Sequence, residues 1–135
     1  MWCIILGMEP VETLRMLKQF GNERVTTIVN PRPIHSIDLT GQGYPDRQKV
    51  MDQVKHLSNM FWEVNATEEA QKIGNPILAN MILIGTLVQT GLLPLDEKML
   101  GAVIEQMFPR AVDVNISALR KGMEMVRAQS KILDR

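Results

Sequence analysis

A run of 17 mostly apolar residues, 77–93, limits most strongly what this chain can fold into. A membrane-spanning helix needs about 20 predominantly apolar residues, so the run lies at the lower edge of that length. Asn80, Thr86 and Gln89 interrupt it, and lipid would leave their polar groups without hydrogen-bond partners. The run therefore predicts a helix buried in protein, packed against a sheet on one side and against a second helix or a second subunit on the other.

Charge and cysteine content exclude several classes of function. The 15 basic and 15 acidic residues cancel and form no run of like charge, which argues against a nucleic-acid or membrane-surface partner. The one cysteine, Cys3, cannot form an internal disulfide, and residues 1–8 lack the basic start of a signal peptide. We therefore expect a cytoplasmic protein. Because 45% of its 135 residues are hydrophobic, residues 1–135 are expected to form a single domain.

Strand-like and helix-like patterns alternate in the first half of the chain. Strands are predicted at 2–8, 24–30 and 60–66, with helices at 9–21 and 46–60. The Pro- and Gly-rich segment 31–45 predicts a surface loop with at most a short extended piece at 37–39. This order is typical of a parallel sheet with crossover helices.

The second half of the chain contains only helical patterns. Helices are predicted at 68–74, 74–94, 94–108 and 113–133, with Thr67 as the N-cap of the first. The helix at 94–108 has Asp96 near its start, and one face of it is formed by Leu100, Val103, Ile104 and Met107. The predicted fold class is therefore α/β, a parallel three- to four-stranded sheet with crossover helices and a helical C-terminal region.

Polar and glycine residues in and beside the apolar run need a structural reason. Asn75 is predicted to cap a helix that has Pro76 at its first position. Asn80 would be a buried amide that needs a hydrogen-bond partner, either within the fold or across a subunit interface. Gly85 and Gly91 lower helix propensity, which predicts a close backbone approach or a helix end.

Candidate binding residues follow the first two predicted strands. Glu9, Asn30 and Arg32 come where ligands collect in open α/β sheets, at the carboxyl ends of the strands. Arg32 is able to hold a phosphate or carboxylate of a coenzyme or substrate, or else to contact a partner subunit or water. An acid such as Glu9 beside a helix N-terminus also compensates the helix dipole. His35 and His56 have no cysteine or second histidine at ligand spacing, so neither is assigned a metal or catalytic role.

A series of short motifs resembles the gamma-type domain of the 2-oxoacid:ferredoxin oxidoreductases. In the first half, "LGMEPVETLR" and "IVNPRPI" resemble that family's strand-to-helix segment and its next strand with a Pro-rich loop. In the second half, the family's pattern falls on Gly74, Asn75, Asn80, Gly85, Leu93, Pro94, Phe108, Asn115, Ala118 and Gly122. The resemblance covers nearly all of the chain and is greatest to the beta subunits of the indolepyruvate branch. It implies a truncated three-layer α/β/α domain.

One departure from the family concerns the start of the domain. Family members open with a Gly-rich G-x-G-G-Q-G turn followed by a segment rich in Ser and Gly, and this sequence contains neither. The "GQG" at 41–43 lies in the Pro-rich loop and does not stand for that turn. We therefore expect the family's N-terminal Gly-rich part to be missing here, and its phosphate-binding role is not transferred to this chain.

The resemblance implies a non-redox accessory subunit of an enzyme that oxidatively decarboxylates a 2-oxo acid, such as indolepyruvate or another arylpyruvate. That enzyme makes an acyl-coenzyme A and reduces ferredoxin. Thiamine diphosphate and the iron–sulfur clusters are expected on a larger partner subunit, through which ferredoxin is reached, and one cysteine cannot ligate a cluster. No catalytic or metal-binding residue is expected on this chain, and the isolated chain is expected to be inactive.

The resemblance also gives the polar residues expected roles. Glu9, Asn30 and Arg32 are candidates for contacts with coenzyme A or the partner, while Asn75, Asn80 and Asn115 are expected at an interface or as structural polar groups. An exposed sheet edge and ten methionines favour self-association when the partner is absent. The alternative is a truncated stand-alone homologue that acts as a binding or assembly module without catalysis. A free-standing nucleotide-binding protein is disfavoured because no phosphate-cradling turn is present.

Overall fold

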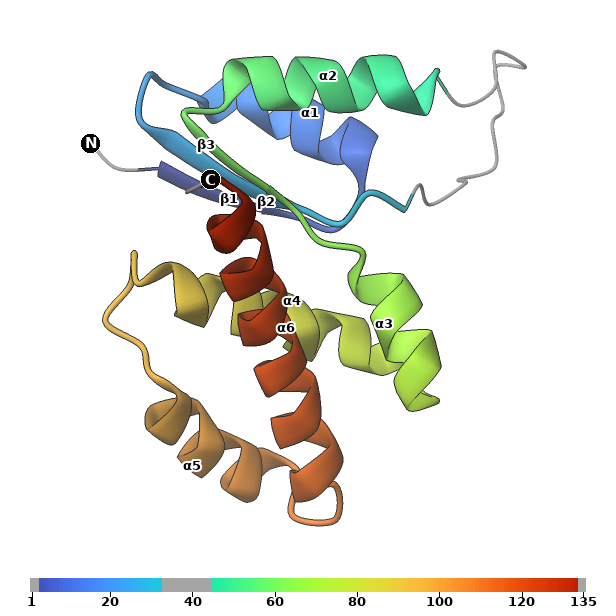
Figure 1. The fold of residues 1–135 in the computed structure, drawn as a ribbon, viewed down its shortest axis with the longest axis vertical. Coiled ribbons are helices and arrows are strands. Elements are labelled where there is room, and N and C mark those ends of the chain that lie inside the picture. The colour runs from blue at the N-terminus through green and yellow to red at the C-terminus, as the bar shows by residue number, and fades with distance from the viewer. Residues whose placement is uncertain (1–2, 33–44, 134–135) are drawn as a thin grey trace. The chain divides into compact units, whose positions relative to one another are not determined.

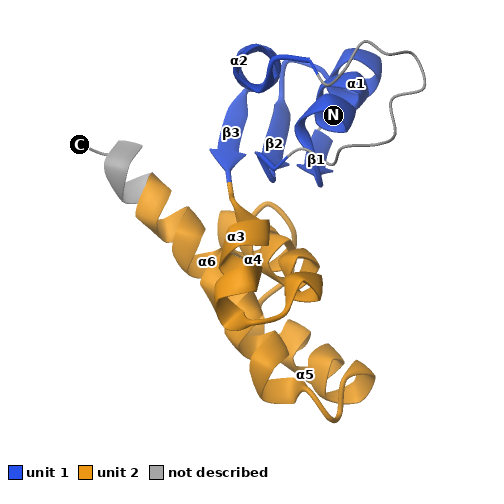
Figure 2. Cartoon of the chain, turned by 90° about the vertical axis from the view of Figure 1, so that its right-hand side faces the viewer, with its two compact units in different colours: residues 1–63 blue, residues 64–135 orange. Residues whose placement is uncertain are grey.

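The computed structural model describes residues 3–32 and 45–133 (Figure 1). The chain divides into two compact units, residues 1–63 and 64–135 (Figure 2). Unit 1 contains β1 (Cys3–Gly7), α1 (Pro10–Phe20), β2 (Val25–Val29), α2 (Arg47–Leu57) and β3 (Met60–Glu63). Unit 2 contains α3 (Ala66–Ile73), the 3-10 helix η1 (Pro76–Leu78), α4 (Ala79–Thr90), α5 (Glu97–Met107) and α6 (Val112–Leu133).

Unit 1 is a parallel sheet with strand order β1-β2-β3. Its helices α1 and α2 both lie on the same face of the sheet (Figure 1), as right-handed crossovers between neighbouring parallel strands place them. The central strand β2 is buried along its whole length, which suits its β-branched sequence VTTIV. The α/β fold class predicted from the alternation is confirmed. The expected extended piece at 37–39 and the "GQG" at 41–43 lie outside the described residues.

The core of unit 1 lies between its helices and its sheet. It consists of Ile5, Leu17, Val25, Val29, Val50, Met51 and Val54, with Cys3, Val11, Leu14 and Phe61 packed against it. The helices place these side chains inward at a spacing of three to four residues, and the strands place them inward at every second residue. Burial of such side chains stabilises the unit by about 1.5–3 kcal/mol for each one that is fully removed from water.

Unit 2 is organised around the crossing of α4 and α6. A Cβ atom added at Gly85 of α4 would lie 2.0 Å from the carbonyl oxygen of Leu119, and one added at Gly122 of α6 would lie 1.9 Å from that of Ile82. The two backbones therefore touch at this crossing, which confirms the close approach predicted for Gly85. The second predicted glycine, Gly91, ends α4 in the left-handed conformation, with φ of 69°.

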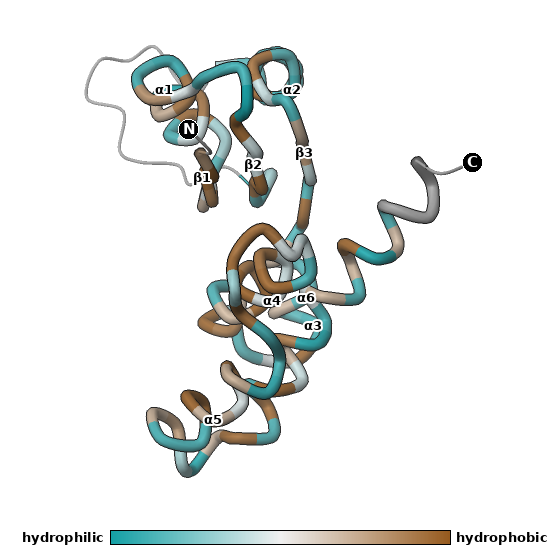
Figure 3. The backbone as a smooth tube through the Cα atoms, turned by 90° about the vertical axis from the view of Figure 1, so that its left-hand side faces the viewer, coloured by the Kyte–Doolittle hydropathy of each residue, from teal (hydrophilic) through white to brown (hydrophobic). Residues whose placement is uncertain are grey.

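Most of the apolar run of the sequence therefore forms α4, a helix enclosed by other parts of the protein. Leu83 and Ile82 of α4 are fully buried, and the second helix expected beside it is α6. Figure 3 shows that apolar residues dominate α4, as a helix enclosed by protein requires. Among the described helices, none combines the length and apolarity that crossing a membrane requires. Packing of α4 on a sheet stays a prediction.

The helix α5 differs from its prediction. Asp96 caps it by accepting a hydrogen bond from the Met99 amide at 2.8 Å, so the helix begins at Glu97, three residues after the predicted start at 94. Ile104 is buried and Leu100 is half-buried, but Val103 is 46% and Met107 64% exposed. The face that these four residues form is therefore buried only in part, because one narrow line of α5 packs on the rest of unit 2.

Two further expectations about polar residues are corrected by the structure. The N-cap of α3 is Asn65, whose side chain accepts from the Glu68 amide at 3.1 Å, and Thr67 lies inside the helix. The side-chain oxygen of an N-cap residue accepts a hydrogen bond from the backbone amide two or three residues later, and Asn65 directly precedes the first residue of α3. Asn80 is exposed in the first turn of α4, so the buried amide expected there is not found.

The expectation that residues 1–135 form a single domain stays a prediction.

Candidate functional site

The candidate site is the edge of the unit 1 sheet where the parallel strands end. Gly7 of β1 is in register with Val29 of β2, and the Asn30 amide donates to the Gly7 carbonyl oxygen at 2.9 Å. This bond extends the ladder by one residue and places Asn30 beside the turn that leads to Glu9. Arg32 follows two residues later and is exposed. The structure thus places Glu9, Asn30 and Arg32 at one edge, as parallel strands dictate.

Glu9 is tied to the start of α1. Its side chain is buried and accepts a hydrogen bond from the Glu12 amide, and Pro10 occupies the first helical position. A carboxylate at this place satisfies an otherwise unpaired amide and compensates the positive end of the helix dipole. The geometry therefore gives Glu9 a structural task at the candidate edge, which is the simpler of the two interpretations drawn from the sequence.

Thr13 completes this turn, and sequence reasoning did not single it out. Its hydroxyl donates to the Glu9 carbonyl oxygen at 2.5 Å, and a Cβ added at Gly7 would lie 1.8 Å from that hydroxyl oxygen. Gly7 is therefore required so that α1 can approach the end of β1 this closely. The only available signal was a threonine one turn into the helix that follows a strand ending in glycine.

Of the three predicted residues, Glu9, Asn30 and Arg32, only Arg32 is exposed to solvent. Asn30 is only 4% exposed, and Glu9 only 6%. An exposed guanidinium beside the ends of parallel strands is suited to bind a phosphate or carboxylate with two parallel hydrogen bonds. His35 lies outside the described residues, and His56 is exposed on α2.

The three amides of unit 2 have different surroundings. Asn75 caps η1, accepting from the Ile77 amide at 3.1 Å, with Pro76 at the first position as predicted. Asn115 is buried and its side chain donates to the Ala111 carbonyl oxygen at 2.8 Å, one turn back along α6. Both amides are thus structural in this chain. An interface role for the exposed Asn80 stays a prediction.

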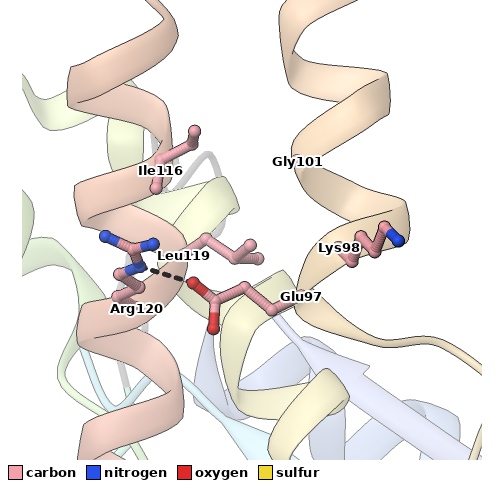
Figure 4. A pocket seen from close by; sticks show the side chains of 6 residues that line it. All are labelled: Glu97, Lys98, Gly101, Ile116, Leu119 and Arg120. Carbon is pink, nitrogen blue, oxygen red and sulfur yellow. Dashed lines mark hydrogen bonds and ion pairs between the residues drawn. The ribbon is translucent and has the colours of Figure 1, made fainter.

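A hollow, separate from the candidate edge, lies between α5 and α6 in unit 2. It has a volume of about 410 Å³ and is lined by Glu97, Lys98, Gly101, Ile116, Leu119 and Arg120. Figure 4 shows that Glu97 points across it to Arg120, with which it forms an ion pair, while Lys98 is directed away from α6. Ile116 and Leu119 give it an apolar floor. Because Glu97 and Arg120 already pair with each other, neither of these two charges is free for a ligand.

An ion-pair cluster joins α3 to α6. Glu69 of α3 lies 3.1 Å from the Lys72 ammonium and 3.6 Å from that of Lys121 on α6. The hydrogen bond that Lys72 donates to Glu69, with the negative charges of Glu69 and Glu68, raises the pKa of Lys72 above its ordinary value of 10.5. Exposed pairs of this kind contribute little to stability and are screened by salt. The cluster is therefore a surface feature of the unit.

The described residues do not suit a metal or an iron–sulfur cluster. No group of three or more His, Cys, Asp or Glu side chains within 3–32 and 45–133 is placed to hold a metal ion. Clusters are held by four ligands, mostly cysteine thiolates, and the whole sequence has one cysteine, Cys3. The chemistry of the donor set thus does not fit a cluster on this chain.

Comparison with known proteins gives the chain relatives over most of its length. Subunits named indolepyruvate oxidoreductase subunit IorB are 34% identical in Pyrococcus horikoshii, 32% in Thermococcus kodakarensis and 30% in Archaeoglobus fulgidus. The first two matches cover 92% of this chain and 63% of the relative, and the third covers 88% and 60%. The chain thus spans a little under two thirds of the length of these relatives. No solved structure matches it.

The family follows from a match along nearly the whole sequence. Residues 3–125 match the sequence profile described as pyruvate ferredoxin/flavodoxin oxidoreductase. The matched region includes every strand and extends into α6, so it takes in both units of the fold. It also agrees with the resemblance carried by the motifs from residue 6 to Gly122. The chain is therefore a member of the pyruvate ferredoxin/flavodoxin oxidoreductase family.

Proposed function

We propose that this chain is a non-redox accessory subunit of a thiamine-dependent 2-oxoacid:ferredoxin oxidoreductase that acts on indolepyruvate or a related arylpyruvate. The observation that carries the proposal is the family match over residues 3–125, together with relatives that share the name indolepyruvate oxidoreductase subunit. In the proposed reaction, the bond between the carboxylate and the keto carbon breaks and carbon dioxide leaves. Two electrons go to ferredoxin, and the acyl group forms a thioester with the sulfur of coenzyme A, whose thiol proton is released.

The chemistry of this reaction is assigned to a larger partner subunit. Thiamine diphosphate would supply the carbanion stabilisation that decarboxylation needs, and iron–sulfur clusters would carry the electrons. A single cysteine and the lack of a metal-binding group among the described residues support placing both on the partner. Ferredoxin would then be reached through that partner, and this chain would contribute binding surface without a catalytic residue. We place the complex in the cytoplasm.

The partner and its cofactors are tested together by purification. The chain is affinity-purified from its native cells under anaerobic conditions, and the material is examined by mass spectrometry and by its visible spectrum. We expect a stoichiometric larger chain, iron–sulfur absorbance and bound thiamine diphosphate, with dye reduction that depends on indolepyruvate and coenzyme A. A colourless chain that comes down alone would contradict the proposal and favour a binding or assembly module without catalysis.

The surface that this chain contributes is assigned to the edge that carries Arg32. Its exposed guanidinium is suited to the phosphates of coenzyme A or to an acidic group of the partner. We expect Arg32→Gln in the complex to raise the KM for coenzyme A about tenfold, as loss of a charge-assisted hydrogen bond does, with little change in kcat.

A matched control lies at the other end of the same strand. Arg24 is also exposed but precedes β2, so Arg24→Gln removes the same charge from the opposite edge of the sheet. Kinetics of both variants as a function of coenzyme A concentration make the comparison. Equal effects of the two substitutions, or no effect of Arg32→Gln on either KM or complex formation, would remove Arg32 from the binding surface.

A further inference from the structure

The 11-residue helix α5 has an exposed face that contains both apolar and charged residues. Ile104 is 1% exposed and packs inward with Leu100, whereas the opposite side carries the exposed residues Lys98, Met99, Ala102, Val103, Glu105 and Gln106. We refer to these six residues as the outward face. Their spacing is that of one heptad, in which Met99, Ala102 and Gln106 form the seam and Val103, Lys98 and Glu105 flank it.

The two charges of the outward face have a complementary pattern. Lys98 and Glu105 are seven residues apart, so they lie on the same side of the helix but about 10 Å from each other along its axis. At that distance they do not pair with each other, and neither forms an ion pair with another residue in the part of the chain that is described. Figure 4 shows Lys98 directed away from α6.

We propose that a second copy of this chain docks on the outward face, with the two α5 helices antiparallel about a two-fold axis near Ala102. In an antiparallel pair, the flanking position that holds Lys98 faces the position that holds Glu105 in the second copy, and symmetry makes this pair twice. A parallel pair instead brings Lys98 next to Val103 of the second copy and leaves both charges unpaired. The charge pattern thus selects the antiparallel orientation.

The other residues of the outward face suit the same arrangement. Ala102 lies near the axis, where its small side chain lets the two helices approach closely. Met99 is 50% and Val103 46% exposed in the single chain, and both would be covered by the second copy. The face is small compared with the roughly 800 Å² per partner of a standard interface, so we expect a weak dimer.

The first experiment measures association of the purified 135-residue chain by sedimentation equilibrium over an about hundredfold range of concentration. We expect the wild type to form dimers and Lys98→Glu to raise the dimer dissociation constant about tenfold, because two attractive pairs become two repulsive ones. The double variant Lys98→Glu/Glu105→Lys restores both pairs and should return the constant to within about twofold of wild type. The matched control is Lys55→Glu, which reverses the charge of an exposed residue on α2.

The second experiment tests the position of the axis. In a Cys3→Ser background, Ala102→Cys places two thiols opposite each other, and oxidised glutathione should cross-link the dimer through a disulfide. Ala128, which is also exposed, lies on α6; Ala128→Cys is the control and should cross-link far more slowly. Circular dichroism and melting temperature of each variant establish that it is folded before its association is measured.

Three results would overturn the proposal. These are a wild-type chain that stays monomeric throughout, a dimer whose dissociation constant Lys98→Glu leaves unchanged, and cross-linking of Ala102→Cys no faster than that of Ala128→Cys. If a different polypeptide covers the outward face in cells, the chain alone gives the first result. The experiments use neither cofactor nor partner, so their failure would leave the proposed function as it stands.

Discussion

At the scale of single residues, the most demanding positions in this chain are two glycines. Gly85 and Gly122 let the backbones of α4 and α6 touch, and any side chain there meets a carbonyl oxygen of the facing helix within about 2 Å. A glycine inside a helix ordinarily costs about 1 kcal/mol relative to alanine. At these two positions the close packing of the two helices offsets that cost.

The contact predicts opposite effects for chemically identical substitutions. We expect Gly85→Ala and Gly122→Ala each to lower the free energy of unfolding by about 1–3 kcal/mol, because the helices must move apart. Gly101→Ala in α5 meets nothing within 4 Å, so it should raise stability by about 0.5–1 kcal/mol through helix propensity alone. Urea unfolding of the three variants at low protein concentration makes the comparison, and a destabilising Gly101→Ala would contradict it.

Residues were predictable from sequence where the reason for them is local. Asn75, Asp96 and Gly91 act within one turn of their own helix, and each was recognised at or near a helix end. For Gly85 the sequence predicted a close approach or a helix end but not the partner of the approach, because Gly122 is 37 positions away (122 − 85). Thr13 and Asn80 were misjudged or missed because their burial depends on packing that no local pattern records.

At the scale of elements, α4 is the helix whose surroundings the sequence described best. Its apolar residues predicted burial in protein, and Leu83 is 0% exposed. We expect Leu83→Glu to lower the free energy of unfolding by more than about 3 kcal/mol, since a buried carboxylate without a partner is among the most destabilising changes. The melting temperature should fall accordingly.

A neighbouring residue provides the control for this substitution. Ile77, in η1, is 80% exposed although it belongs to the same apolar run. Ile77→Glu should therefore change stability by no more than about 0.5 kcal/mol. A similar loss in both variants would show that the run is sensitive to charge along its length and would not support burial of Leu83 in particular.

The helix α5 shows where element-scale prediction fails. Its periodicity correctly predicted a helix and one buried line through Ile104, but periodicity alone cannot tell an apolar face that meets the core from one that meets solvent or another chain. The sequence therefore grouped Val103 and Met107 with Ile104 on one face but could not show that these two are exposed. The same limit applies to Arg32, whose exposure at the sheet edge became known only from the fold.

At the scale of the whole molecule, a hydrophobic cluster is found within each of the two units. One cluster includes Val54 in unit 1, and the other includes Ile104 in unit 2. Periodicity placed the helices and strands of both clusters but contained no information on which elements share a core. Sequence alone therefore predicted the fold class and the order of elements better than their grouping.

A cluster within each unit predicts that the loss of a buried side chain destabilises its own unit most. Val54→Ala and Ile104→Ala should each cost about 2–4 kcal/mol of local stability, because both side chains are almost completely buried. In hydrogen exchange, Val54→Ala should reduce protection mainly within residues 3–32 and 47–63, and Ile104→Ala mainly within 64–133. Loss of protection spread evenly over both units by either variant would mean that they open together.

The crossing of α4 and α6 also bears on how long the folded chain persists. The segment between Gly85 and Gly122 includes all of α5, and it must close on itself before the two helices can meet. We expect this contact to form late in folding, so that Gly85→Ala accelerates unfolding more than it slows refolding in stopped-flow experiments. The absence of a side chain at Gly85 and Gly122 would then determine how slowly unit 2 unfolds, and have less influence on how fast it folds.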